Sequence, residues 1–186
     1  SIRSRFQVDP WGELRSLTRA RIALGRAGGS LPTSELLAFS ANHAAARDAV
    51  WSVLEVNRLE AEARVLGLPA IGVSSQAPDR ATYLQRPDLG RRLNETDQRK
   101  LQGMRLEGGC DVVIIVADGL SAAAANRYAM AVVSSLVGRL VDGGLCLGPI
   151  VLAQQARVAL EDPVGVALNA RAALILLGER PGLGSP

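Results

Sequence analysis

Residues 172–184 read AALILLGERPGLG, an apolar run that ends abruptly in a charged pair among glycines and a proline. A short apolar run bounded by turn residues is typical of a strand that is buried on both faces of a parallel sheet. Glycine and proline then keep the chain in a loop, so Glu179 and Arg180 are expected at the carboxyl edge of the sheet. Open α/β sheets bind their ligands at that edge.

A second strand-to-loop passage has the same form. Residues 111–121 read DVVIIVADGLS, a buried strand followed by a turn, and an alanine-rich helix is expected after it. Strands separated by helices of this length favour parallel βαβ units with right-handed crossovers. The two loops are therefore expected to lie side by side. The predicted strands span residues 110–116, 146–153 and 172–177, and the predicted helices span residues 121–141 and 163–170.

The first part of the chain is predicted to be mainly helical. An aspartate-proline pair starts a helix over residues 9–24, and Thr33 or Ser34 caps a second helix that continues through at least Leu59. These two helices would form an α-helical hairpin. Residues 69–73 have the composition of a short strand.

A polar helix capped by Asn94 is expected to end near residue 106, and the Gly108-Gly109 pair is typical of a joint between two regions. We therefore predict an α/β fold in two domains. A mainly helical N-terminal domain would span residues 1–107, and a domain with a parallel sheet would span residues 108–186.

Composition indicates a soluble cytoplasmic protein. The net charge is +3, and acidic residues alternate with most arginine clusters. Aromatic residues make up only 3% of the chain, which disfavours nucleic-acid binding because few rings are available to stack on bases. No signal peptide is recognisable, and no uncharged apolar run reaches the roughly 18 residues that span a bilayer. Cys110 and Cys146 each begin an apolar segment, which predicts two buried thiols in a reducing compartment.

Few residues have the pattern of a reactive site. His43, the only histidine, is interpreted as a satisfied and partly buried helical residue, since a metal site or catalytic triad needs partners at matching spacing. The DGLS loop has one glycine where a dinucleotide fingerprint has three, which disfavours an NAD enzyme. Ser121 is predicted to cap the following helix, whose free N–H groups are also suited to a phosphate.

The charged residues near the predicted strand ends are interpreted as ion pairs on the solvent-exposed surface. Arg157 with Glu161 and Asp162 forms one such group, and Glu179 with Arg180 forms another. Surface ion pairs contribute little energy. The residues alone thus predict an α/β binding domain of unknown ligand.

Longer strings of sequence are more specific. Six such strings, which together extend along nearly the whole chain, occur in the same order as in the small (light) subunit of ethanolamine ammonia-lyase, and the chain resembles that family. The strings are DPW at 9–11, RSLTRARI at 15–22, LGRAG at 24–28, YLQRPDLGRRL at 83–93, ADGLS at 117–121 and GERPGLG at 178–184.

The resemblance implies half of an adenosylcobalamin-dependent lyase that converts ethanolamine to acetaldehyde and ammonia by a radical route. In this family the large subunit is a TIM barrel that holds the substrate, and cobalamin lies between the two subunits. The resemblance also implies that the domain at residues 108–186 is a Rossmann-like cobalamin-binding domain, which follows the helical N-terminal domain. The cofactor performs the difficult chemistry while the protein orients it and excludes water. No catalytic acid or base and no metal ligand is therefore assigned to this chain.

The family's cobalamin contacts match two positions of this sequence, Val158 and Glu179. We expect Val158 to pack its side chain, or to present its backbone, against the largely apolar face of the corrin or against the nucleotide tail of the cofactor. Glu179 is expected to accept hydrogen bonds from amide or hydroxyl donors. The resemblance implies base-on cobalamin, because the Asp-x-His-x-x-Gly loop of another cobalamin family does not occur here and His43 lies in the helical region.

Two departures from the family pattern bear on these expectations. Ala156 stands where the family usually has glycine, which adds a side chain near the cofactor loop. The family continues for several dozen residues past the position of Pro186 and has a cysteine contact to cobalamin there, so the C-terminal domain is expected to be truncated.

Other interpretations stay open. The chain would otherwise be a noncatalytic α/β module that binds a phosphate-bearing ligand or a protein, or, as a weaker alternative, a nucleic-acid binder. Within the family interpretation, we expect a hetero-oligomer in the cytoplasm or in a bacterial microcompartment. The subunit interface is predicted near Arg15, Arg19, Arg21 and Arg26, since guanidinium groups tolerate desolvation when paired.

Overall fold

A parallel sheet of four strands forms the body of the protein. The computed structural model describes residues 6–18 and 20–182. The strands are β3 (Ala70–Ser74), β4 (Cys110–Ala117), β5 (Leu147–Gln154) and β6 (Ala170–Leu177). They lie in the order β3-β5-β4-β6, and every neighbouring pair is parallel. The predicted α/β fold with a parallel sheet is therefore confirmed.

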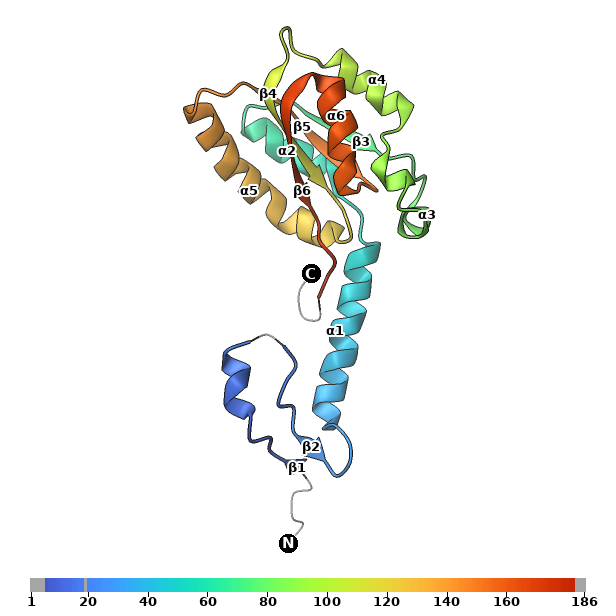
Figure 1. Cartoon of the computed structure of the whole chain (residues 1–186), viewed down its shortest axis with the longest axis vertical. Coiled ribbons are helices and arrows are strands. Elements are labelled where there is room, and N and C mark those ends of the chain that lie inside the picture. The colour runs from blue at the N-terminus through green and yellow to red at the C-terminus, as the bar shows by residue number, and fades with distance from the viewer. Residues whose placement is uncertain (1–5, 19, 183–186) are drawn as a thin grey trace.

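Helices cover both faces of this sheet (Figure 1). On one face, α2 (Val56–Val65) and α5 (Ala122–Asp142) pack on side chains such as Ile114. On the other face, α4 (Glu95–Gly103) and α6 (Glu161–Leu168) pack on side chains such as Ile115. Because β4 is buried on both faces, its sequence is a continuous apolar run rather than an alternating one.

The local signals in this part of the sequence gave good element boundaries. Ser121 caps α5 by accepting a hydrogen bond from the Ala124 amide at 3.2 Å, and Asn94 caps α4 by accepting one from the Asp97 amide at 2.9 Å. Both caps were predicted. The short helices of this part are α3 (Arg80–Gln85), η2 (Leu89–Arg91) and η3 (Val158–Leu160).

The sheet takes strands from both sides of the predicted domain boundary. β3 lies within residues 1–107 and pairs with β5, while the other three strands lie within residues 108–186. The predicted strand at 69–73 is thus confirmed as β3. The division of the chain at residues 107 and 108 stays a prediction, and β3 belongs structurally to the body rather than to a helical region.

An elongated arm precedes the body (Figure 1). It consists of β1 (Phe6–Gln7) and β2 (Arg26–Ala27), which pair antiparallel, the 3₁₀ helix η1 (Gly12–Ser16) and the long helix α1 (Thr33–Trp51). The predicted helix over residues 9–24 is wrong, since η1 is the only helical segment among the described residues of this range. The exposed fractions of Leu14 (39%) and Leu17 (81%) explain this, because a helix without a surface for its apolar face gains little stability.

The predicted second helix and the helical hairpin also need correction. The helix is interrupted between Trp51 and Val56, where Leu54 turns into the core of the body. Asn126 of α5 stabilises this break: its side chain donates to the Val53 carbonyl and accepts from the Glu55 amide, both at 2.9 Å. At the other end, Pro32 occupies the N-cap position of α1 without a side-chain hydrogen bond, so neither Thr33 nor Ser34 caps it.

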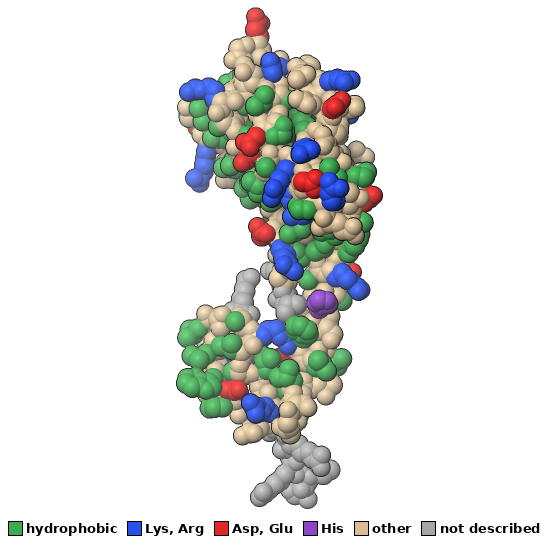
Figure 2. Space-filling view, turned by 45° about the vertical axis from the view of Figure 1, so that its right-hand side comes forward, with side chains coloured by type: hydrophobic (Ala, Val, Ile, Leu, Met, Phe, Trp, Pro, Cys, Tyr) green, Lys and Arg blue, Asp and Glu red, His purple; other side chains and the backbone are tan. Residues whose placement is uncertain are grey.

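Within the described residues, no helix combines the length and hydropathy needed to cross a bilayer. The arm nevertheless carries many apolar side chains on its surface, as Figure 2 shows below the body. Among them are Trp11, Leu36 and Leu37, with exposed fractions of 67%, 54% and 64%. Ala49 is the buried residue of α1.

Candidate functional site

The two adjacent strands β4 and β5 are followed by helices that pack on opposite faces of the sheet. β4 continues into α5 on one face of the sheet, and β5 continues through η3 into α6 on the other face. Such a switch point opens a crevice at the carboxyl edge, which is the usual ligand site of open α/β sheets. The candidate site lies at this edge.

A buried carboxylate, that of Asp118, occupies this crevice and bridges the ends of β4 and β5 by hydrogen bonds. Asp118 follows β4 and is 4% exposed. It accepts hydrogen bonds from the main-chain amides of Gln155 (2.8 Å) and Ala156 (3.1 Å), which follow β5. Arg80 forms an ion pair with it at 3.3 Å. Burial raises the pKa of Asp118, and the two amides and Arg80 act in the opposite direction.

The loops after β4 and β6 lie side by side, as predicted. Gly178 donates to the Ala117 carbonyl at 3.1 Å and accepts from the Leu120 amide at 2.7 Å. Two glycines allow this approach. A Cβ on Gly119 would lie 2.2 Å from the Gly178 carbonyl oxygen, and a Cβ on Gly178 would lie 2.2 Å from the Ser121 carbonyl oxygen.

An open hollow of about 600 Å³ lies next to these loops. Val158 and Glu179, the two residues matched to cobalamin contacts, both line it. Val158 is 51% exposed, and Glu179 is exposed as well. Leu120 and Leu177 add apolar surface to the wall. The sequence-predicted pair is therefore brought together on one accessible surface.

The charged neighbours of these two residues are arranged differently from the predicted surface pairs. Glu161 and Asp162 line the same hollow. Arg157 instead stacks on Tyr83, with its guanidinium carbon 4.4 Å from the ring centroid, and donates to the Tyr83 carbonyl at 3.3 Å. The Glu179 carboxylate accepts from the main-chain amide of Arg180 at 2.9 Å.

Tyr83 lies at the centre of a cluster that sequence reasoning missed. Two guanidinium groups contact its ring, those of Arg157 and Arg80, and the Arg80 guanidinium carbon lies 4.8 Å from the ring centroid. Its hydroxyl donates to the Ala156 carbonyl at 3.0 Å. Burial raises the pKa of Tyr83 to about 12, so the hydroxyl stays protonated at neutral pH. Only an aspartate directly after a strand hinted at this cluster; Tyr83 had no sequence signal.

Three other predicted residues lie outside the hollow. Ala156 is fully buried in the core beneath α6, so its methyl group does not intrude on the proposed cofactor surface. Ser121 is fully buried and caps α5. His43 lies on α1 and is exposed rather than partly buried, because α1 projects away from the body; its ring stacks on Phe39 at 6.3 Å.

The cysteine prediction is half correct. Cys110 is buried, but Cys146 is exposed because it lies in the turn that precedes β5. Among the residues that the structure describes, no group of three or more His, Cys, Asp or Glu side chains is arranged to hold a metal ion.

The predicted arginine-rich interface is partly engaged within the chain. Arg15 and Arg21 pair with Glu35 of α1 at 3.4 Å and 3.6 Å. Arg26 is exposed, and Arg19 lies outside the described residues, as do Leu183 and Gly184 of the GERPGLG string. Whether these arginines contact a partner stays a prediction.

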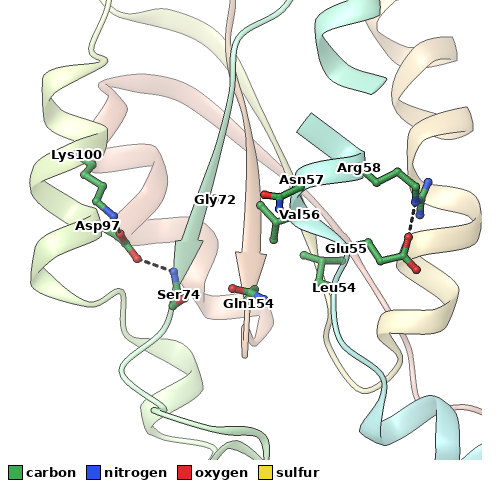
Figure 3. Close-up of a pocket in the computed structure, with 10 residues that line it drawn as sticks. All are labelled: Leu54, Glu55, Val56, Asn57, Arg58, Gly72, Ser74, Asp97, Lys100 and Gln154. Carbon is green, nitrogen blue, oxygen red and sulfur yellow. Dashed lines mark hydrogen bonds and ion pairs between the residues drawn. The ribbon is translucent and has the colours of Figure 1, made fainter. Parts of the chain in front are cut away.

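A second hollow, of about 710 Å³, lies at the ends of β3 and β5 (Figure 3). Its charged groups are mostly paired with one another: Asp97 accepts from Lys100 and from the Ser74 amide, and Glu55 pairs with Arg58. Figure 3 shows these two pairs on opposite sides of the hollow. We regard this hollow as a structural groove, since its charged side chains already pair with one another.

Comparisons with known proteins agree with the resemblance seen in the sequence. The model of the family "Ethanolamine ammonia-lyase light chain (EutC)" matches residues 8–186. A protein of Azotobacter vinelandii named ethanolamine ammonia-lyase small subunit is 51% identical over 188 residues, which cover 100% of this chain and 70% of the relative. Proteins with that name from Xanthomonas campestris and Pseudomonas putida are 48% and 47% identical, over 96% of this chain and 66% of each relative.

The chain spans about two thirds of the length of these curated relatives. A match over almost every residue of this chain, at such identity, is decisive for ancestry. The protein belongs to the ethanolamine ammonia-lyase light-chain, or small-subunit, family.

Proposed function

We propose that this chain acts as the small subunit of an adenosylcobalamin-dependent ethanolamine ammonia-lyase. Together with a large subunit, it would convert ethanolamine to acetaldehyde and ammonia. The observation that carries this proposal is the placement of Val158 and Glu179 on one open hollow at the carboxyl edge of the sheet. When bound, adenosylcobalamin supplies the radical chemistry that the side chains of this chain lack.

The residues around the hollow fit part of a corrinoid. Val158, Leu120 and Leu177 provide an apolar wall, and the Glu179 carboxylate offers acceptor oxygens for amide or hydroxyl donors. The hollow is open, so a second polypeptide is needed to cover the ligand and exclude water. In this arrangement the chain binds and orients the cofactor, and it contributes no acid or base.

We also propose the base-on form of the cofactor, in which the lower cobalt ligand comes from the cofactor itself. The only histidine of the chain, His43, lies on the arm helix α1 rather than among the residues that line the hollow. Ligation of cobalt by this histidine is therefore disfavoured. The spectrum of the bound cofactor would reveal histidine ligation and so contradict this form.

The arm is the part of the chain that we propose to contact the large subunit. α1 joins the body at the same end as the hollow (Figure 1), where Arg80 donates to the Val50 carbonyl at 2.7 Å. A partner that covers the hollow would therefore also meet the arm. Exposed apolar side chains such as Leu36 and Leu37 are suited to burial in such an interface.

Reconstitution tests the proposal. The chain is co-expressed with a large subunit, the complex is purified, and acetaldehyde formation from ethanolamine is measured with and without adenosylcobalamin. Product that depends on both the chain and the cofactor supports the proposal. A stable complex that forms no product under these conditions contradicts it, and a chain that binds only phosphate ligands would favour a noncatalytic module.

The role of Glu179 is tested in the same complex. Glu179→Gln removes the charge of an exposed acceptor, so the dissociation constant of adenosylcobalamin should rise about tenfold while the melting temperature stays unchanged. Glu107→Gln is the matched control, because Glu107 is exposed and precedes β4 at the opposite edge of the sheet. Equal affinity in the Glu179 variant and the control refutes the assignment.

A further inference from the structure

The turn that carries Val158 has an unusual number of fixed main-chain groups. Gln155 follows β5 with a φ of 50°, a left-handed conformation that costs a non-glycine residue energy and needs support from its surroundings. Asp118 accepts from the amides of Gln155 and Ala156, and the Arg157 amide donates to the Gly90 carbonyl at 2.8 Å. Three successive amides of the turn are thus bonded outside the turn itself.

Carbonyl and side-chain contacts hold the same turn from the other side. The Tyr83 hydroxyl donates to the Ala156 carbonyl. The Arg157 side chain stacks on the Tyr83 ring, and both side chains pack against Gly90, where an added Cβ would approach Arg157 Cγ and Tyr83 Cε2 to 2.9 Å. The turn therefore has little freedom to move, and Val158 begins η3 directly after it.

From this geometry we infer that Asp118 is a positioning residue that fixes residues 155–157 and thereby sets where Val158 meets the ligand in the hollow. Asp118 does not line the hollow, so it acts through the turn rather than by touching the ligand. This inference rests on the proposed function, because it assigns a role within the same site.

Arg80 has a supporting part in this arrangement. Its Nη1 pairs with Asp118, and its Nε donates to the Val50 carbonyl at the end of α1. The side chain of Arg80 is 11% exposed, so the pair lies in a region of low dielectric where the carboxylate needs all of its donors. Asp118 therefore links the end of β4, the turn after β5 and the root of the arm.

The test uses Asp118→Asn in the complex with the large subunit, with adenosylcobalamin as the probe. Asparagine offers one acceptor oxygen, so one of the two turn amides loses its partner. We expect the dissociation constant of adenosylcobalamin to rise about tenfold or more, as for the loss of a hydrogen bond to a charged group. With saturating cofactor, the kcat of the variant should stay close to that of the unmodified complex.

Asp111→Asn is the matched control. Asp111 also lies on β4 and accepts from a main-chain amide beside β5, that of Cys146 at 2.9 Å, but it does so at the amino edge of the sheet. It should lower stability without changing cofactor affinity. Equal affinity losses in the two variants would overturn the inference, because a general loss of stability would then explain both losses. An unchanged affinity in Asp118→Asn would also overturn it, because the position of Val158 would then not depend on the Asp118 carboxylate.

A second variant keeps the inference testable if Asp118→Asn does not fold. Tyr83→Phe removes only the hydroxyl that holds the Ala156 carbonyl, and it should raise the dissociation constant by about two- to tenfold. Asp111→Asn serves again as the control and should leave the affinity unchanged, because Asp111 lies at the opposite edge of the sheet. Unchanged affinity in Tyr83→Phe would overturn the inference, whereas failure of the unmodified complex to bind adenosylcobalamin would instead refute the proposed function.

Discussion

The Leu120 amide donates to the Gly178 carbonyl over 2.7 Å, so the loop after β4 and the loop after β6 are bonded main chain to main chain. This contact joins Asp118, at the start of one loop, to Glu179, in the other. It also leaves no space for a side chain between them, since a Cβ on Gly119 would overlap the Gly178 carbonyl oxygen. The shape of the proposed cofactor wall therefore depends on the missing side chain of Gly119, which itself lines the hollow.

Gly119→Ala is expected to separate the two loops. Gly119 has a φ of 51°, and an alanine would meet the Gly178 carbonyl oxygen at 2.2 Å. The free energy of unfolding should fall by about 1–3 kcal/mol or more, because a residue with a side chain pays about this much for such a strained backbone conformation. Urea denaturation measures it.

Gly138→Ala provides the control for that experiment. Gly138 lies inside α5, and an added Cβ would have no neighbour within 4 Å apart from its chain neighbours and the adjacent backbone of the helix. This substitution should stabilise the protein by about 0.4–1 kcal/mol, because alanine loses less chain entropy than glycine in a helix. Similar destabilisation by both substitutions would show that the contact between the loops has no special role.

The body could be predicted from the sequence because its signals are local. An apolar run, a serine or asparagine cap and a glycine-rich turn each act within a few residues, and β4, α5 and α4 end close to where these signals place them. Val158 and Glu179 came from family resemblance. Their common surface agrees with the rule that parallel strands end at one edge.

The arm and the buried cluster could not be predicted in this way. Helical spacing in residues 9–24 exists, but helix formation also needs a surface to cover the apolar face, and η1 has none. Arg80 lies only three residues before Tyr83 on α3, but the contact of Tyr83 with Arg157 joins side chains far apart in the sequence. No periodicity or spacing encodes such a contact, because it exists only after the sheet has formed.

The two cysteines should differ in reactivity. Cys146 is exposed, whereas burial raises the pKa of the Cys110 thiol and its neighbours Cys146 and Asp111 raise it further. The thiolate is the reactive form. Ellman's reagent should therefore modify one thiol rapidly in the native protein and the second only after unfolding. Cys146→Ser should abolish the rapid reaction, and a rapid reaction that persists in this variant would contradict the assignment.

Asp97 should make stability depend on pH. Burial acts to raise its pKa, but hydrogen bonds from Lys100, Asn94 and the Ser74 amide together hold the pKa below its ordinary value of 3.8. A carboxylate with a lowered pKa contributes stability above the unfolded-state pKa and loses it as the pH falls through the folded-state pKa. The contribution should thus be complete near pH 7 and decline below about pH 4.

Asp97→Asn tests this in urea denaturation at pH 7 and pH 3. The variant should lose about 1–3 kcal/mol of unfolding free energy at pH 7, because a charged acceptor of buried donors is replaced, and the difference should shrink at pH 3. Glu95→Gln on the same helix is the control. Glu95 is highly exposed and pairs with Arg99 only at 3.6 Å, so its effect should stay within about 0.5 kcal/mol. A difference that is equal at both pH values would refute the role of the Asp97 charge.

Binding of the large subunit should depend on the apolar side chains of the arm. Leu36 and Leu37 of α1 are 54% and 64% exposed, and a glutamate at either position remains solvated in the free chain. The double variant Leu36→Glu, Leu37→Glu should therefore keep its melting temperature and bind the large subunit at least about tenfold more weakly, since buried charges without partners oppose association. Val166→Glu is the control, because Val166 is 73% exposed on α6, away from the arm. Analytical ultracentrifugation of the mixed subunits measures the assembly of both variants.

If the double variant assembles with the large subunit as well as the control does, the large subunit does not bind the arm. If the double substitution instead changes self-association of the free chain, the arm contacts a second copy of this chain.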